Sequence, residues 1–183
     1  MSLEFLESQI SDIRSKAEQV RNQYERETQA INNDTSLSDS GKRERVSAYH
    51  DAAKAKMQKL RQNEVKLVED RKQQLSQDLF GLSSTTSSDP NQIIAYRDAQ
   101  DRASKIESGE EAQRLLDSAT LSGDKSLTSA ILARAFNEGW SKIIDKHAAD
   151  NPQSLSKMRD LKKLQEYNTF ASAGFTYMVS SLR

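Results

Sequence analysis

The fold is decided by residues 3–31, LEFLESQISDIRSKAEQVRNQYERETQAI. The large apolar side chains of this stretch alternate at spacings of three and four residues. That alternation is the heptad pattern of an α-helix that packs against another helix along a narrow seam. A polar position at Glu27 and then Ile31 complete the run. The seam residues that we predict to mediate self-association are Leu6, Ile10, Ile13, Val20 and Tyr24.

A second long helix is predicted over residues 39–80, after a polar break at residues 32–34. Its apolar stripe is expected at Val46, Tyr49, Ala53, Met57, Leu60, Val65 or Leu67, Val68, Leu75 and Leu79. A short connection between two long helices favours an antiparallel hairpin or coiled coil. Residues 1–34 carry seven acidic and four basic side chains, whereas residues 35–81 carry seven acidic and ten basic ones. These opposite net charges favour pairing of the two helices, either within one chain or between chains.

The N-terminal part is expected to end at residues 80–82, Phe-Gly-Leu, with Gly81 in the left-handed conformation that often follows a helix. Small hydroxyl residues dominate the next stretch, LSSTTSS at residues 82–88, and give it nothing to bury. We therefore predict an N-terminal hairpin or coiled coil over residues 1–81, a linker over residues 82–89, and a second domain over residues 90–183.

The second domain is predicted to be a small bundle of shorter helices. Asp89 and Pro90 have the residue types that begin a helix, and this helix should end near residues 108–109. Residues 122–124, Ser-Gly-Asp, should end one helix and cap the next, which is expected to continue to Ile144 with Trp140 in the core. Pro152 opens the last helix. Since no strand is predicted, the fold class is all-α.

Composition excludes several classes of protein. Lys and Arg total 27, as do Asp and Glu, so the chain has no overall field to attract nucleic acid or an anionic membrane. Cysteine is absent, and no apolar run approaches the roughly 20 residues needed to span a bilayer. No signal peptide is recognisable, so we expect a soluble protein.

The sequence offers little chemistry. His50 and His147 lie far apart, and neither has metal-ligating residues at ligand spacing. No glycine-rich phosphate loop or nucleophile motif is present. We therefore predict neither a cofactor nor an enzymatic activity, and we expect His50 to be a structural histidine beside the apolar stripe.

The C-terminal stretch from Tyr167 to Leu182 has no charged residue and is rich in aromatic side chains. These side chains must be buried, either in the C-terminal bundle or against a partner. The second alternative makes the stretch a docking segment for a partner or a second copy, with Gly174 loosening its connection to the preceding helix. Its docking residues would be Phe175, Tyr177, Met178 and Leu182.

Several short motifs, none of them an active-site motif, occur between residues 37 and 147: LSDSGKRER (37–45), AKAK (53–56), AYRDA (95–99), SGD (122–124), ARAF (133–136) and GW (139–140). Together they resemble a loosely defined family of helical proteins encoded among the virion structure and assembly genes of tailed phages of Gram-positive bacteria. The resemblance implies a role in capsid or tail assembly, as a scaffold-like or connector-like part, and a location in the cytoplasm of the host cell or in the virion. It transfers no catalytic residue.

The function predicted from the sequence is thus that of a non-enzymatic structural or assembly protein, which acts through helix–helix contacts with protein partners and as a homo-oligomer. The alternative is a nucleic-acid-associated helical protein. Its phosphate contacts would be Lys42, Arg43, Arg45, Lys54, Lys56, Lys59 and Arg61. The salt dependence of binding distinguishes the two functions, because phosphate contacts weaken steeply as the salt concentration rises and contacts along an apolar seam do not.

Overall fold

The computed structural model describes residues 3–82, 89–149, 152–167 and 175–180. These residues form seven α-helices and no strand, which confirms the all-α prediction. The chain divides into two compact units, Met1–Asp70 with Glu166–Arg183, and Arg71–Gln165. We call them the first and the second unit. Two helices, α2 and α7, contribute residues to both.

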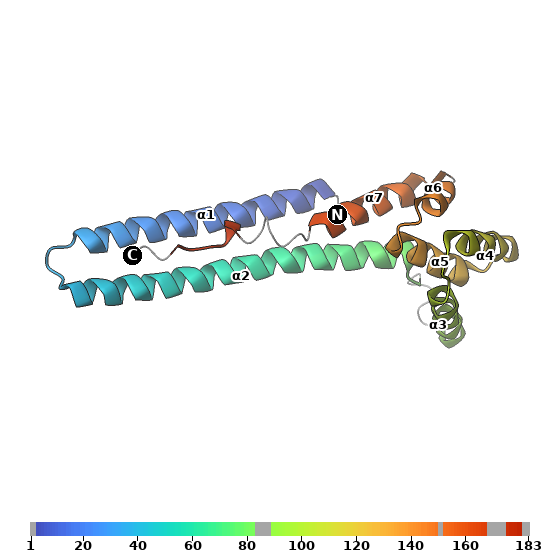
Figure 1. Cartoon of the computed structure of the whole chain (residues 1–183), viewed down its shortest axis with the longest axis horizontal. Helices are drawn as coiled ribbons and strands as arrows, with labels where there is room; N and C mark the ends of the chain where they lie inside the picture. Colours follow the sequence, from blue (N-terminus) through green and yellow to red (C-terminus); the bar gives the residue numbers. More distant parts are fainter. Residues whose placement is uncertain (1–2, 83–88, 150–151, 168–174, 181–183) are drawn as a thin grey trace. The chain divides into compact units, whose positions relative to one another are not determined.

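The first unit is built on α1 (Leu3–Asn33) and the larger part of α2 (Asp39–Phe80). These two helices run antiparallel, side by side (Figure 1). The chain turns between them because the Asp34 carboxylate accepts hydrogen bonds from the backbone N–H and the hydroxyl of Ser36, at 2.8 and 2.5 Å. Ser38 then accepts from the N–H of Gly41 and Lys42 donates to the Asn32 carbonyl, so both ends of the loop are held.

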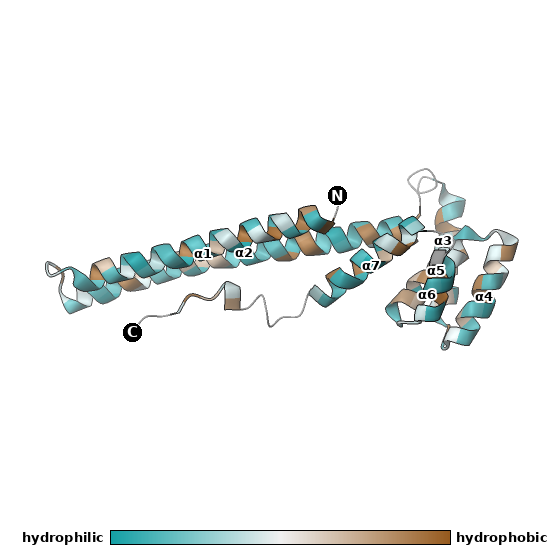
Figure 2. Cartoon of the chain, turned by 90° about the horizontal axis from the view of Figure 1, so that it is seen from above, coloured by the Kyte–Doolittle hydropathy of each residue, from teal (hydrophilic) through white to brown (hydrophobic). Residues whose placement is uncertain are grey.

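The seam of α1 is buried at most of the expected positions. Leu6, Ile10, Ile13 and Tyr24 are buried and Val20 is half-buried, within a single chain. Near the end of the helix, Thr28 rather than the predicted Glu27 is fully buried. Hydrophilic residues cover much of α1 and α2, and apolar residues recur between them, which is the pattern of helices with one buried stripe (Figure 2). Whether these seam residues also associate between chains stays a prediction.

The stripe of α2 differs from the expected one at Tyr49, and of the two alternatives Val65 and Leu67 it contains Leu67. Ala53, Met57, Val68 and Leu75 are buried and Leu67 is half-buried, but Tyr49 and Val65 are exposed. Their expected places are taken by half-buried His50 and buried Glu64. The prediction was wrong there because it followed apolar side chains, whereas the backbone follows the three–four spacing whatever the side chain is.

The second unit is a bundle of short helices. It contains the end of α2, then α3 (Pro90–Ser104), α4 (Gly109–Ser122), α5 (Lys125–Asn137), α6 (Ser141–Ala149) and most of α7 (Pro152–Tyr167). α5 is the central helix, because it packs against α3, α4 and α6. Its buried residues are Leu127, Ala130, Ile131, Leu132 and Ala135.

Helix boundaries in this unit follow local chemistry. Asp89 caps α3 by accepting from the N–H of Asn91 at 2.9 Å, and Asp124 caps α5 by accepting from the N–H of Leu127 at 2.9 Å. Gly123 separates α4 from α5 with φ +71°, a conformation that favours glycine. These starts and stops agree with the sequence prediction.

Two predicted helix boundaries in this unit and the predicted burial of Trp140 were wrong. The single helix expected up to Ile144 is two helices, because Gly139 (φ +71°) ends α5 and the N–H of Trp140 closes the turn on the Ala135 carbonyl at 2.9 Å. Trp140 itself is half-buried rather than central to the core. α3 ends at Ser104, earlier than expected.

Gly81 also differs from its expected conformation. Among the described glycines, only Gly123 and Gly139 have positive φ. Gly81 instead continues the helical hydrogen bonding with an N–H bond of 2.9 Å to the Gln77 carbonyl. A Cβ at this position would lie 2.5 Å from that carbonyl oxygen, so the need for glycine comes from close approach.

The predicted domain division is not the division into units. Residues 83–88, most of the predicted linker, lie outside the described residues. The units divide within α2 and within α7, so that the C-terminal residues belong with the N-terminal helices.

Candidate functional site: a buried carboxylate that holds the C-terminal segment

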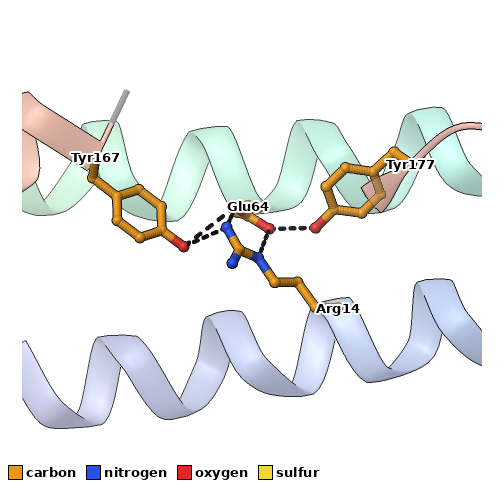
Figure 3. A network of polar contacts seen from close by, with 4 residues as sticks. All are labelled: Arg14, Glu64, Tyr167 and Tyr177. Carbon is orange, nitrogen blue, oxygen red and sulfur yellow. Dashed lines mark hydrogen bonds and ion pairs between the residues drawn. The ribbon is translucent and has the colours of Figure 1, made fainter. Parts of the chain in front are cut away.

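The most unusual feature of the first unit is a carboxylate inside the apolar seam. Glu64, on α2, is 3% exposed. A charged group out of water is costly unless hydrogen bonds and an opposite charge compensate it. Glu64 has both, from residues that lie far from it in the sequence (Figure 3).

The opposite charge comes from Arg14 on α1. Its Nη2 lies 2.9 Å from Glu64 Oε1 and its Nε lies 3.3 Å from Oε2, a two-pronged pairing that fixes the orientation of both groups. The hydrogen bond with Glu64 raises the pKa of the Arg14 guanidinium above its usual value, against the effect of burial. The pair therefore links α1 to α2 at one defined register.

Two tyrosines complete the cluster. The hydroxyl of Tyr177 donates to Glu64 Oε2, and the hydroxyl of Tyr167 lies 3.5 Å from Oε1. Arg14 Nη2 also donates to the Tyr167 hydroxyl at 2.7 Å, with its guanidinium carbon 5.5 Å from the centre of the Tyr167 ring. Burial, followed by the contact with Glu64, raises the pKa of both tyrosine hydroxyls. Both stay neutral donors at physiological pH.

Tyr177 belongs to a short stretch, residues 175–180, that we call the C-terminal segment. Its ring packs against Ile13, Ala17 and Met57, and Val179 packs against the same apolar cluster. Arg21 Nη2 donates to the backbone carbonyls of Thr176 at 2.6 Å and Phe175 at 3.4 Å. The segment is thus held by one buried side chain and by its own backbone.

The remaining large side chains of the segment point away from this cluster. Phe175 is 77% exposed and Met178 is 60% exposed. Phe175 borders an open depression of about 530 Å³ on α1, lined by Ser11, Arg14, Ser15, Glu18, Arg21, Phe175 and Thr176.

The structure therefore separates the residues predicted to dock a partner. Tyr177 is buried in its own unit, whereas Phe175 and Met178 are on the surface. Leu182 and Gly174 lie outside the described residues. The docking role of these residues stays a prediction.

Arg14, Arg21 and Glu64 were not predicted as site residues, although the sequence carries a signal for them. Arg14 and Arg21 are seven residues apart and directly follow the seam positions Ile13 and Val20, so they share one flank of the seam. Glu64 lies seven residues after Met57 and therefore at a seam position. A buried acidic position on one helix and a repeated arginine on the other would have indicated the pair.

The residues predicted for the nucleic-acid alternative do not form one continuous patch. Lys54 and Arg61, seven residues apart, follow one flank of the α2 seam, while Lys56 and Lys59 follow the other. Lys42 donates to the Asn32 carbonyl. The basic side chains of α2 are thus distributed on both sides of its buried stripe.

The two histidines belong to different units. The ring of His50 packs edge-on against Tyr24, with 5.9 Å between ring centres, and its Nδ1 is 3.7 Å from the Asp51 carboxylate. His147 belongs to the other unit. Among the described residues, no group of three or more histidine, aspartate or glutamate side chains could hold a metal ion. No helix in that part of the chain has the length and apolarity to cross a membrane.

Two of the surface hollows in the described part of the second unit lie beside large apolar side chains. One, of about 460 Å³, has an apolar floor that includes Phe136, Ile144 and Met158, below a rim of charged side chains. The other, of about 680 Å³, lies beside Trp140 where the ring covers Gly109. Neither combines a buried charge with convergent hydrogen bonds as the Glu64 cluster does.

In comparisons with known proteins, no family model, no curated protein and no solved structure matched the chain.

Proposed function

We propose that this chain is a non-enzymatic structural protein that assembles with protein partners, including further copies of itself. The observation that supports this proposal is the C-terminal segment. Tyr177 is inserted into the first unit, while Phe175 and Met178 on either side of it are exposed. Large apolar side chains held at a surface by a buried neighbour are typical of interaction sites.

The chemistry of the Glu64 cluster agrees with a structural role. The carboxylate is engaged by Arg14 and by both tyrosines, so its hydrogen-bonding capacity is used inside the chain. A general base needs a reachable proton on a substrate, and a nucleophile needs an open approach. The narrower proposal, a scaffold-like or connector-like role in phage virion assembly, rests on the resemblance carried by residues 37–147.

Light scattering on the full chain tests the proposal. We expect the mass to rise above the 20.6 kDa of one chain as concentration increases. The double variant Phe175→Ser/Met178→Ser should assemble less, since it removes exposed apolar area and leaves Tyr177 in place. Ile94→Ser is the matched control, because Ile94 is 65% exposed on α3 in the other unit. A mass that stays at one chain at every concentration would contradict self-assembly.

The nucleic-acid alternative makes a different prediction. Binding through the lysines and arginines of α2 would weaken by orders of magnitude between about 50 and 200 mM salt. Assembly through apolar contacts should change little over that range. A filter-binding titration with duplex DNA at both salt concentrations separates the two functions.

A further inference from the structure

We propose that the first unit contains a receptor groove for a tyrosine-bearing peptide, and that in the assembled state the C-terminal segment of a second copy occupies it. This inference rests on the proposed function and adds a second way to join the copies, besides the exposed side chains of Phe175 and Met178. The groove consists of three polar residues above an apolar floor. Its members are Arg14, Arg21, Glu64, Ile13, Ala17 and Met57.

The groove recognises three features of its occupant. The apolar floor accepts an aromatic ring, and Ala17, the smallest residue of the seam, leaves room for it. The buried Glu64 carboxylate accepts a hydrogen bond from the ring hydroxyl. Arg21 binds two successive backbone carbonyls on the N-terminal side of the tyrosine. The ligand class is therefore an uncharged peptide with a tyrosine at the end of a short helical turn, followed two residues later by an aliphatic side chain such as Val179.

In this structure the groove holds the segment of its own chain. The ring, hydroxyl and carbonyl contacts described above are made by residues 175–180 on one side and by α1 and α2 on the other. A second copy carries both halves, so the same contacts can form between chains with no new chemistry. Exchange of an identical element between copies is a low-cost route to an oligomer.

Chain length limits how far apart the two grooves can be. Tyr167 and Tyr177 are ten residues apart, and both contact the same Glu64 carboxylate. Ten residues can span at most roughly 33–36 Å when extended. Helices have diameters of about 10–12 Å, so two first units lying side by side place their grooves within that reach. The exchange predicts laterally associated copies.

The self-assembly surface predicted from the sequence would not serve as well. The α1 seam is buried within the chain, so pairing of two copies through it would require α1 and α2 to separate. Exchange of the segment uncovers only the surfaces that contact Tyr177 and Val179. The identical segment of the second copy then covers them again.

A complementation experiment with two full-length variants tests the proposal. Tyr177→Ala removes the inserted side chain and keeps the groove. Arg21→Glu keeps the segment and places a carboxylate against its two carbonyls. Each variant alone should lack the exchange dimer, whereas an equimolar mixture should form a heterodimer of twice the 20.6 kDa chain mass by light scattering. A mixture that stays at the mass of the separate variants would overturn the exchange, while assembly of the unmodified chain would still support the proposed function.

A peptide binding measurement keeps the test decisive if a variant folds poorly. Circular dichroism first shows whether Tyr177→Ala is folded; if it is not, Tyr177→Leu, which keeps apolar volume but has neither ring nor hydroxyl, replaces it in both arms of the experiment. A synthetic peptide with the sequence of residues 175–180, FTYMVS, should bind this variant and dissolve the heterodimer. The matched peptide FTFMVS lacks the hydroxyl and should bind at least about tenfold more weakly, because Glu64 loses a charge-assisted hydrogen bond. Equal binding of the two peptides, or no binding of either, would overturn the receptor groove.

Discussion

At the scale of single residues, the stability of the apolar seam between α1 and α2 depends on Glu64. A carboxylate at a seam position is a defect unless its hydrogen bonds are complete. Here Arg14 and two tyrosines from the C-terminal part of the chain complete them. The residue spacing of α2 places Glu64 in the seam. Residues far from it in the sequence supply the hydrogen bonds that offset the cost of burying its charge.

Replacement of this carboxylate should therefore destabilise the chain. Glu64→Ala leaves the two tyrosine hydroxyls without their acceptor and Arg14 without its partner, and we expect a loss of about 2–3 kcal/mol in the free energy of unfolding. Glu44→Ala, an exposed glutamate on the same helix, should change it by less than about 0.5 kcal/mol. Urea denaturation followed by circular dichroism measures both; equal effects would mean that the cluster contributes nothing.

The tyrosines make stability depend on alkaline pH. The pKa of Tyr177 is raised in the folded chain by burial and by its hydrogen bond to Glu64, whereas in the unfolded chain it titrates near 10. Above about pH 10 the unfolded chain binds fewer protons than the folded one, so the free energy of unfolding falls as pH rises. One such tyrosine contributes a slope of up to about 1.4 kcal/mol per pH unit. Urea titrations between pH 8 and 11 should show a shallower fall for Tyr177→Phe, and identical slopes would contradict the assignment.

At the scale of elements, the helices follow two independent rules. The three–four spacing fixes which face of α1 and α2 is buried, and capping residues fix where the shorter helices begin and end. Ile10 illustrates the first rule and Gly139 the second.

The seam rule predicts the result of placing a charge at Ile10. This side chain is buried in α1, so Ile10→Asp should cost about 3–5 kcal/mol through lost burial and an unpaired charge. Ser8→Asp places the same charge on an exposed position of the same helix, where the effect should stay within about 0.5 kcal/mol. Thermal melts followed by circular dichroism compare them, and an unchanged melt for Ile10→Asp would contradict the buried seam.

The boundary rule predicts that two glycine substitutions change the free energy of unfolding in opposite directions. Gly139 has φ +71°, so Gly139→Ala forces a side chain into the left-handed region and should cost about 1–2 kcal/mol. Gly41 lies in the first turn of α2, where an added Cβ meets ordinary contacts of 3.5 and 4.0 Å. Gly41→Ala should therefore stabilise the chain by up to about 1 kcal/mol. Differential scanning calorimetry would refute the argument if both substitutions shifted the melting temperature in the same direction.

At the scale of the whole molecule, the two ends of the chain belong to one unit. The C-terminal segment and the last residues of α7 contact α1 and α2, although α3 to α6 and most of α7 precede them in the sequence. The stability of the first unit therefore depends on residues that follow the second unit in the sequence.

Limited proteolysis tests whether the C-terminal residues hold on to the two N-terminal helices. Proteinase K should cut first between Leu82 and Asp89, since short side chains without charge or bulk favour protease access. The two fragments should separate on a denaturing gel but elute together under native conditions, because Tyr167 and Tyr177 of the later fragment bind Glu64 of the earlier one. Cleaved Glu64→Ala should come apart more readily. First cleavage inside α2 would contradict the predicted linker.

The sequence by itself determined the helical class, the α1 seam and most helix boundaries, because these depend on spacing and capping within a few residues. His50 was expected beside the α2 stripe rather than in it, and Glu64 was missed, since the spacing that places them in the seam was read from apolar side chains alone. Only the tertiary structure decided that residues 175–180 pack onto α1 and α2, and that Tyr177 is buried while Phe175 and Met178 are exposed. Those outcomes depend on contacts between residues more than 100 positions apart, such as Glu64 and Tyr177, and no local pattern encodes which distant hydroxyl will satisfy a buried carboxylate.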